Sequence, residues 1–553
     1  MFMPEPRTCQ NCQASFVVED DDFRFYEKVK VPPPTLCVAC RKQRRLAQGN
    51  HLFLYKRQCD ATGKPIISNY APNGAYKVFD QAYWHSDAWD GVYFGRDFDF
   101  NRSFFEQYGE LSKAVPRPAL QTAFHFDENS QYTNYAGKNK NCYLIFDSDE
   151  NWDCYYSYST NSSKSCSDCY RVKQCELCYE CIDCENCYRS YFLQDCEQCI
   201  DSAYLKNCIG CKNCFMSSNL RHKEYYIQNQ PVGKELYEEW MARLGFRSGI
   251  EADKKAWAEF ALKFPQKFMH GTHNENVTGD YLVNCKNAVQ CFDSRDLWDC
   301  KYFDQSFMDA KDCMDIQECG DKAELLYETA FSGYSVYNLK FCLHCLSPNR
   351  NLQYCNYCVS CEDCFGCIGL KRKKYCVLNK QYTKEEYESL LPKIIEQMKS
   401  SGEYGEFFPI QLSSFAYNET LAQDFYPLTK KDAVTQGYKW RDEEAKNTVA
   451  ASVLPDSIDE TEEDICDRIL ACEDCARNYA INKQEFTLMK HFLKVALPRK
   501  CFFCRHQARR AQRNPRRLWN RPCMKCGTEM KTSYAPERPE IVYCEKCYLE
   551  AVY

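Results

Sequence analysis

The cysteines in the middle of the chain fall on a lattice of three residues, and this spacing restricts the fold more than any other feature. Between residues 130 and 220, all 14 cysteines share one phase of that lattice. The other residues on the lattice are small or aliphatic apart from two asparagines, whereas the charged residues lie off it. Rows of four lattice positions repeat every twelve residues, which predicts a narrow β-solenoid with four inward positions per coil.

This coil geometry resembles that of the twelve-residue insect antifreeze β-helices, which also turn cysteine and serine inward. The resemblance implies the geometry of the coil and no activity. The lattice recurs less regularly in the second half, where Cys300 and Cys313 are separated by a one-residue slip. We interpret such slips as loops or bulges in a second solenoid.

A matched segment follows each of the two coil regions. LRHKEYYIQNQPVGKELY from Leu220 aligns without gaps to LKRKKYCVLNKQYTKEEY from Leu370. Thr383 and Glu386 have the spacing of a capping box, and the apolar residues that follow have helical periodicity. We therefore expect a helix that caps the open end of each solenoid.

The solenoid thiols are interpreted as reduced side chains that pack as small apolar groups. Three alternatives stay open: disulfides between residues twelve apart, an iron-sulfur cluster at Cys175, Cys178 and Cys181, and thiols that bind soft metals or act as a redox buffer. The outer face carries its own periodic residues, which we expect to stack as a ladder or to offer a platform for a partner: Tyr143, Tyr155, Tyr179, Tyr191 and Phe215.

Both ends of the chain contain paired Cys-x-x-Cys motifs. Four thiolates in two such pairs are the ligand set of a tetrahedral structural zinc site with no open position for catalysis. A fourth set has decayed, because only Cys59 survives where Thr62, Asp80 and Tyr83 replace the other three cysteines, and we expect no zinc there. The sequence predicts three zinc sites, with the ligands Cys9, Cys12, Cys37, Cys40; Cys472, Cys475, Cys501, Cys504; and Cys523, Cys526, Cys544, Cys547.

The segment from Cys9 to Arg45 resembles the bacterial "probable zinc-ribbon" domain family, in which a phenylalanine-rich hairpin separates two Cys-x-x-Cys pairs and the second pair runs into C-R-x-x-R. The segment from Cys472 to Arg510 is similar to that family as well. The resemblance implies a zinc-binding fold of the zinc-ribbon or treble-clef type and no particular activity.

Basic residues are concentrated beside these zinc motifs. Residues 499–531 contain 11 lysines and arginines against one acidic residue, although the whole chain has a net charge of -6. Some of this charge would neutralise zinc thiolates, but the number suggests phosphate contacts with nucleic acid, RNA more than DNA. The expected nucleic-acid-binding residues are Arg41, Arg44, Arg45, Arg505, Arg509, Arg510, Arg513, Arg516, Arg517 and Trp519.

No sequence motif points to catalysis. The cluster of His85, Asp87, Asp90, Asp97 and Asp99 lies in an aromatic-rich stretch without a nucleophile elbow, a P-loop or an open metal set. The chain also lacks a signal peptide and a long apolar run, so we expect a cytoplasmic protein that does not enter a membrane.

These patterns together predict a multidomain, mainly β protein with two narrow β-solenoids, helical caps and flanking zinc-ribbon or treble-clef modules. The leading hypothesis is a zinc-binding cytoplasmic scaffold or adaptor, not an enzyme, that binds nucleic acid. The alternatives are a structural or assembly protein acting through solenoid faces by protein contacts or self-association, and a thiol-based metal or redox buffer. The expected divisions are 1–57 (zinc-ribbon-like), 58–95 (degenerate zinc ribbon), 96–129 (aromatic connector), 130–222 (solenoid), 223–270 (helical cap), 271–372 (solenoid), 373–410 (helical cap), 411–467 (acidic linker), 468–520 (zinc-ribbon-like) and 521–553 (zinc ribbon).

Overall fold

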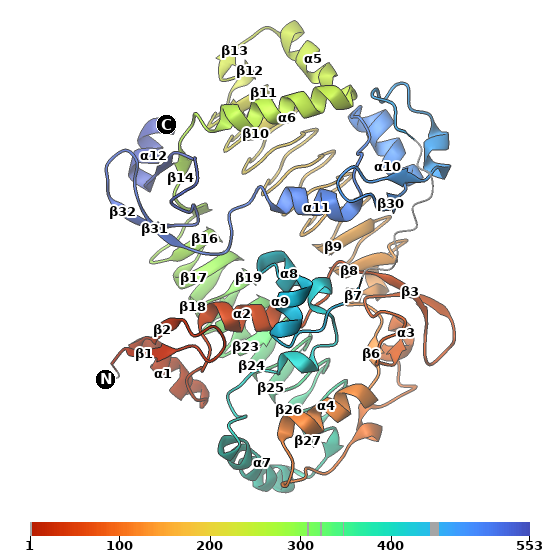
Figure 1. Ribbon diagram of the computed structural model, residues 1–553, viewed down its shortest axis with the longest axis vertical. Helices are drawn as coiled ribbons and strands as arrows, with labels where there is room; N and C mark the ends of the chain where they lie inside the picture. The colour runs from red at the N-terminus through yellow and green to blue at the C-terminus, as the bar shows by residue number, and fades with distance from the viewer. Residues whose placement is uncertain (1–2, 307–308, 321–322, 347, 443–452) are drawn as a thin grey trace.

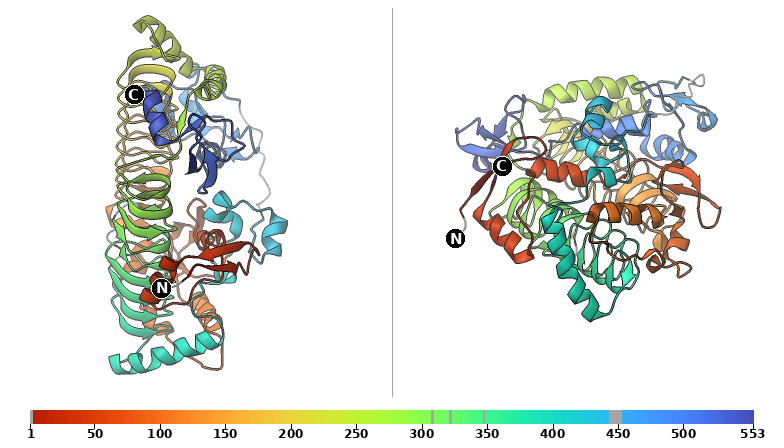
Figure 2. Two further views of the ribbon diagram at one scale, coloured as in Figure 1. Left: turned by 90° about the vertical axis from the view of Figure 1, so that its left-hand side faces the viewer. Right: turned by 60° about the horizontal axis from the view of Figure 1, so that its bottom comes forward.

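The computed structural model describes residues 3–306, 309–320, 323–346, 348–442 and 453–553. The protein is a mixed α/β molecule in which two regions of stacked parallel coils form one long wall (Figure 1). We call residues 122–231 the first stack and residues 271–381 the second stack. The N-terminal and C-terminal regions project from the same side of this wall at different heights along it, as the left view of Figure 2 shows.

The first stack has a register of twelve residues. Tyr143 pairs in parallel with Tyr155, and the same offset recurs in isolated bridges up to that of Ile209 with Arg221. Longer strands occur only at its two ends: β7 Thr122–Ala123, β8 Tyr132–Gly137, β9 Tyr143–Asp149, β10 Ala203–Lys206, β11 Lys212–Ser218, β12 Glu224–Ile227 and β13 Gln230–Pro231.

The period of three arises from the backbone, because every third residue turns a corner. In the triplet that starts at Cys142, the cysteine is buried, Tyr143 makes the bridge, and Leu144 has a positive φ of 50°. A left-handed conformation costs a non-glycine residue roughly 1–2 kcal/mol. Backbone hydrogen bonds between coils offset this cost: the amide of Tyr155 donates to the Cys166 carbonyl at 2.9 Å, and the amide of Tyr156 donates to the Tyr143 carbonyl at 3.0 Å.

The inward side chains satisfy the remaining polar backbone groups. The Cys166 thiol lies 3.4 Å from the carbonyl oxygen of Lys164 and 3.5 Å from that of Cys175, and it donates in this direction. The amide of Cys169 donates to the Ser157 hydroxyl oxygen at 3.0 Å. Serine and cysteine therefore exchange along the lattice because both are small and both can donate and accept inside a narrow core.

The second stack contains longer coils, which explain the slip in its lattice. Leu297 pairs with Ala310 and Val336 with Asn349, both thirteen residues apart, whereas the offset returns to twelve at its end. The strands are β15 Gly271–Thr272, β16 Thr278–Val283, β17 Lys286–Arg295, β18 Leu297–Lys301, β19 Asp304–Ser306, β20 Ala310–Lys311, β21 Met314–Cys319, β22 Ala323–Glu324, β23 Tyr327–Ala330, β24 Val336–Lys340, β25 Asn349–Gln353, β26 Glu362–Phe365, β27 Lys374–Val377 and β28 Lys380–Gln381.

Strand pairing in the second stack returns on itself. Strand β17 pairs with both β18 and β19, and each of these pairs with β21. The centre of the molecule is therefore a closed, barrel-like arrangement of parallel strands. The sequence predicted two separate narrow β-solenoids, and the strand pairing supports only this coarser description.

Helices cover the free end of each stack. In the first, α5 Lys234–Ala242 and α6 Arg247–Ala261 contact β11, and in the second, α7 Lys384–Ser400 contacts β27. Helix α7 begins at the expected capping box, in which the Thr383 hydroxyl oxygen accepts from the Glu386 amide and the Glu386 carboxylate accepts from the Thr383 amide. That prediction is confirmed.

Four of the five rings predicted as an aromatic ladder in the first stack are buried, and the fifth, Tyr143, is half-buried. Tyr155, Tyr179, Tyr191 and Phe215 are at most 5% exposed, and Phe215 packs edge-on against Trp240 of α5 at 5.3 Å. These rings therefore stabilise the contact between the stack and the elements that cover it, and they do not form an external platform.

The chain ends form four small modules. The N-module contains β1 Glu5–Thr8, β2 Ser15–Val18, α1 Asp20–Val29 and α2 Val38–Leu46, and the C-module contains β29 Leu470–Ala471, β30 Asn478–Tyr479, α10 Lys483–Thr487 and α11 Phe502–Arg510. Each is adjacent in sequence to a hairpin module. The N-hairpin contains β3 Tyr55–Gln58, β4 Pro65–Ser68, β5 Val78–Phe79 and α3 Gln81–His85, and the C-hairpin contains β31 Trp519–Pro522, β32 Glu529–Thr532, β33 Val542–Tyr543 and α12 Glu545–Val552.

Short elements join the modules to the stacks. Helix α4 Phe104–Ala114 precedes β6 Arg117–Pro118, which pairs with β5, and β14 Gln266–Lys267 pairs with β33. Helices α8 Leu421–Phe425 and α9 Lys430–Thr435 belong to a segment, residues 411–442, that we call the strap.

The region expected to be a solvated acidic linker is packed where the structure describes it. Tyr417 and Leu421 of the strap are at most 2% exposed, and so are Ile458 and Ile465 further along. The rest of the expected linker, residues 443–452, lies outside the described residues. No helix in the described part of the chain combines the length and the apolar composition that a bilayer-spanning segment needs.

Candidate metal centres and the arginine-lined interfaces

Three groups of four cysteines could each hold a metal ion. In every group the four sulfur atoms lie within 4.8 Å of one another. Single Sγ–Sγ separations are 3.7 Å for Cys12 and Cys37, for Cys475 and Cys501, and for Cys526 and Cys544. A tetrahedron with Zn–S bonds of about 2.3 Å has edges of about 3.8 Å, so the geometry fits zinc. All twelve cysteines predicted as ligands belong to these groups.

The decayed set keeps the fold of the intact one. The hairpin β3–β4 pairs Tyr55 with Ser68, as β31–β32 pairs Trp519 with Thr532. The amide of Asp80 donates to the Cys59 sulfur at 3.2 Å, as the amide of Cys544 donates to the Cys523 sulfur at 3.2 Å.

A carboxylate takes the place of a metal-thiolate contact in this module. The Cys59 thiol donates to Asp80 at 3.4 Å, and the other Asp80 carboxylate oxygen accepts from the Tyr83 amide. Side-chain hydrogen bonds therefore connect the positions that correspond to candidate metal ligands in the C-hairpin.

Cysteine residues of two metal groups begin the two basic helices. Cys37 is the N-cap of α2, and Cys501 is the N-cap of α11. Because the N-cap fixes where a helix begins, a bound ion would also fix the position of the arginines in the following turns.

The arginines of α11 point into the first stack. Arg505 lies 2.6 Å from Asp168 and 2.9 Å from Glu485, and Arg509 pairs with the other oxygen of Asp168. Asp168 is fully buried at a corner of the coil, with a φ of 56°. Burial lowers the pKa of Arg505, but Asp168 and Glu485 together hold that pKa well above its ordinary value.

The arginines of α2 make the same contact with the second stack. Arg41 lies 2.8 Å from Asp315, and Arg45 lies 3.2 Å from the other Asp315 oxygen and 3.2 Å from Glu328. Asp315 is also fully buried and has a φ of 59°. Helix α2 therefore lies on the second stack and α11 on the first, each on the stack from the opposite half of the chain (Figure 1). In each contact one carboxylate lies between two arginines.

Further arginines beyond α11 join the two stacks to each other. Arg513 lies 2.6 Å from Asp183 of the first stack and 2.6 Å from Asp293 of the second. Arg516 lies 2.7 Å from Asp293, which also approaches Arg171. Burial alone would raise the pKa of Asp293, but the three arginines hold it well below its usual range.

Most of the residues predicted to bind nucleic acid thus lie in contacts inside the protein. Arg44 lies 3.0 Å from both Glu328 and Glu406 and is only partly exposed, and Arg510 lies 3.5 Å from Asp424. Arg517 is exposed and lies over the half-buried Trp519 ring at 5.1 Å.

Sequence reasoning missed the acidic partners of these arginines. Asp168, Asp183, Asp293 and Asp315 all occupy coil corners with positive φ. Aspartate is favoured in that conformation, and such residues are normally solvated at turns, so their role at an interface was not visible. The available signal was the position of each aspartate two residues after an inward lattice residue.

The coil thiols are separate from the metal groups. Among the described residues, the clusters that could hold an ion are the three at the chain ends, and they include no coil cysteine. All the coil cysteines are buried, and none is in a disulfide. This arrangement agrees with thiols that pack and hydrogen bond within the coils.

Comparison with known proteins gives no family for this chain. No protein-family model matches it. No curated protein matches it. Five chains of solved structures match, among them a "putative acetyltransferase from Desulfovibrio desulfuricans G20". That match has 8% sequence identity and a TM-score of 0.11, and it covers 40% of this chain and 63% of the other, less than two thirds. Such a score carries no argument about fold or activity.

Proposed function

We propose that this protein is a zinc-stabilised scaffold that acts through protein contacts and not as an enzyme. In this proposal each stack is a narrow β-solenoid, and the three cysteine groups hold zinc. The modules hold the first and the second stack together as one rigid body. The reduced thiols of the coils suit the cytoplasm, where disulfides are rare.

The crossed docking of the two modules is the observation that carries the proposal. Helix α2, from the N-terminal end, contacts β21 and β23 of the second stack, and α11, from the C-terminal end, bonds to Asp168 of the first. The buried arginines are thus used to hold the scaffold together, which favours a structural role for the basic modules over an open phosphate-binding surface.

Zinc removal tests the role of the modules. We expect chelation to release α2 and α11 from the stacks, because their N-caps are metal-bound cysteines. Small-angle scattering should show a larger radius of gyration, and amide exchange should rise in both helices while the coils stay protected. An unchanged radius of gyration and unchanged amide exchange after verified loss of zinc would contradict the proposal that zinc keeps the modules docked on the stacks.

Sedimentation velocity tests the scaffold role itself. We expect a concentration-dependent assembly or a stoichiometric complex with a purified partner, since the outer walls of the stacks are the broad surfaces left uncovered by modules (Figure 2). A strictly monomeric protein that forms no defined complex would count against this function.

One observation favours nucleic-acid binding as a second candidate. Arg517 and Trp519 combine an exposed charge with an aromatic ring, and Lys525 and Lys531 are exposed nearby in sequence. If RNA binds there, R517A and K525A should weaken RNA affinity and flatten its salt dependence without unfolding the protein. Unchanged affinity and slope would exclude this surface.

A further inference from the structure

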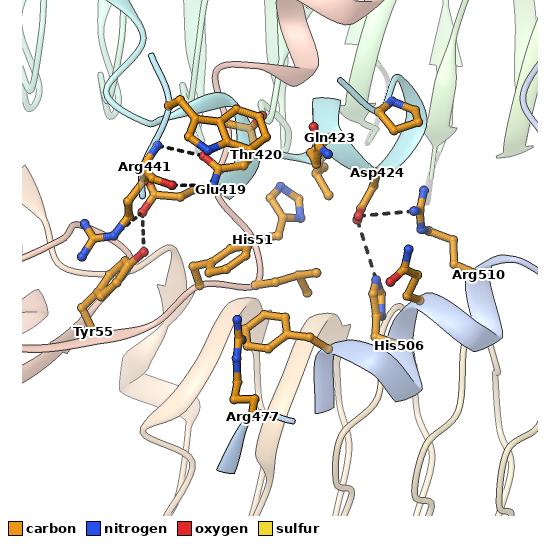
Figure 3. Close-up of a pocket in the computed structure, with 18 of the residues that line it drawn as sticks. His51, Tyr55, Glu419, Thr420, Gln423, Asp424, Arg441, Arg477, His506 and Arg510 are labelled. Atoms are coloured by element: carbon orange, nitrogen blue, oxygen red, sulfur yellow. Dashed lines mark hydrogen bonds and ion pairs between the residues drawn. The ribbon is translucent and has the colours of Figure 1, made fainter. Parts of the chain in front are cut away.

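A cavity of about 790 Å³ lies where the segment that leads into the N-hairpin, the C-module and the strap meet (Figure 3). Its wall combines His51 and Tyr55 from the first end of the chain, Asp424 and Arg441 from the strap, and α11. This volume is within the range of about 300–1,000 Å³ that small-molecule sites occupy. Three segments that are far apart in sequence build it, so it exists only in the docked arrangement.

Aromatic rings and arginines cover the wall together. The rings of Phe53 and Phe503, one from each end of the chain, stack at 4.8 Å with an interplanar angle of 25°. The Arg477 guanidinium lies over the Phe503 ring at 5.0 Å, and Arg441 lies over the Tyr55 ring at 4.6 Å. Such a wall suits a flat π-system, which can stack on both aromatic rings and guanidinium planes.

The carboxylates around the cavity are already engaged by the protein. Glu419 accepts hydrogen bonds from the Tyr55 hydroxyl and the Ala416 amide, and Asp424 lies 3.5 Å from Arg510 (Figure 3). Asp442 lies 2.5 Å from Lys430. Arg441 lies 3.7 Å from Glu419, so a negatively charged ligand meets Arg441 and Arg510 as members of ion pairs, and Glu419 keeps the Tyr55 hydroxyl and the Ala416 amide as donors when Arg441 turns to the ligand.

Polar groups at the wall lack partners within the described part of the chain. The Nδ1 atom of His506, the Nε atom of Arg510 and the side-chain oxygen of Asn478 are buried without a hydrogen bond there. His506 itself is only 3% exposed. These three atoms have essentially no accessible surface, so they lie behind the cavity wall, and a water molecule or ligand would reach them only after a side-chain rearrangement.

We propose that this cavity binds a nucleotide, that is, a flat heteroaromatic ring that carries a negatively charged phosphate. The aromatic wall selects the ring, and the arginines select the phosphate. This site is independent of the scaffold role and of the exposed surface at Arg517. The nucleotide has two possible sources, a free mononucleotide or an unpaired residue of RNA.

Charge variants at Gln507 test the phosphate contact. Gln507 lies on the cavity wall but is exposed, so its replacement leaves the core intact. We expect Q507E to weaken binding of the four nucleoside 5′-monophosphates in equilibrium dialysis by about three- to tenfold and Q507K to strengthen it, because the charges act at short range. The matched control is Q512E, an exposed glutamine just beyond the same helix that does not line the cavity.

A second variant tests the stacking contact. F503L keeps an apolar side chain but removes the ring, and it should weaken mononucleotides by about tenfold or more while leaving the weak binding of inorganic phosphate unchanged. Competition between a labelled unstructured RNA hexamer and mononucleotides distinguishes the sources. Displacement at low mononucleotide concentration identifies the free nucleotide, and tighter binding of the hexamer identifies RNA.

Several results would overturn the proposal. One is that no mononucleotide and no hexamer shows saturable binding at millimolar concentration. Another is that Q507E and Q507K change nucleotide affinity equally, or that Q512E lowers the affinity as much as Q507E does. Hexamer binding that mononucleotides do not displace, or that F503L does not change, would likewise place the RNA elsewhere. If nucleotide binding fails these tests but zinc removal still expands the protein, the nucleotide site is excluded and the scaffold proposal is retained.

Discussion

Asp168 is the residue whose loss should loosen one module without unfolding the stacks. Its two oxygens accept from Arg505 and Arg509, and it is fully buried. Removing one partner of a buried ion pair typically costs about 3–5 kcal/mol. In D168N the amide oxygen can still accept one hydrogen bond, and Arg505 keeps Glu485 at 2.9 Å, so we take the lower end of that range.

The expected change is local and can be measured by hydrogen exchange. A loss of about 3 kcal/mol in docking should raise the exchange rate of the α11 amides roughly 100-fold in zinc-loaded protein, while α2 stays protected. The duplicated chain offers a matched control. D315N acts on α2 instead, and its effect should be smaller, because Glu328 remains near both arginines of α2, at 3.2 Å from Arg45 and 3.9 Å from Arg41, whereas Glu485 remains near Arg505.

Two outcomes would refute this reasoning. Unchanged exchange in α11 of D168N would mean that the buried charge pair does not hold the helix. Equal increases in α2 and α11 for either variant would mean that the two modules do not dock independently on their separate stacks.

Three further predictions address pH, metal and backbone. Burial alone would lower the pKa of His270, but Asp280 and Asp195 raise it to about 9 against the opposing charge of Lys206. The charged ring therefore stabilises the fold fully below about pH 6.5, and this contribution of roughly 3 kcal/mol to the free energy of unfolding is lost as the pH rises through 9. H270Q should remove this pH dependence when unfolding is measured across the same range. Twelve of the 41 cysteines lie in the three four-cysteine groups, and all of the other 29 are buried except the half-buried Cys466. Mass spectrometry should therefore find three zinc ions per chain. A thiol reagent should modify about one cysteine until zinc is removed. Rapid reaction of many thiols with zinc still bound would contradict the packed coils. Gly279 has a φ of 149°, and a Cβ atom there would lie 1.7 Å from the Cys291 carbonyl oxygen. G279A should therefore lower the melting temperature by several degrees. In the control G63A, the new Cβ atom meets no neighbour, so the melting temperature should fall only by the smaller cost of the positive φ.

The inward lattice and the metal ligands could be recognised from the sequence because they depend on local spacing. A residue such as Cys142 repeats every twelve positions because the parallel pairing repeats with that register, and the two residues between Cys9 and Cys12 are the spacing typical of a pair that binds one ion. The thirteen-residue coils near Cys313 were visible only as a slip, because a change of phase does not say whether a coil is longer or a loop is inserted.

The partners of the arginines were decided by tertiary structure alone. Arg505 and Asp168 are 337 residues apart, and nothing in the local sequence distinguishes an arginine that will be buried from one that will meet solvent. The cavity beside His506 has the same origin, since its wall comes from three distant segments. Spacing along the chain determined what each segment can form, and packing between distant segments decided which charges are neutralised inside the protein and which remain available to a ligand.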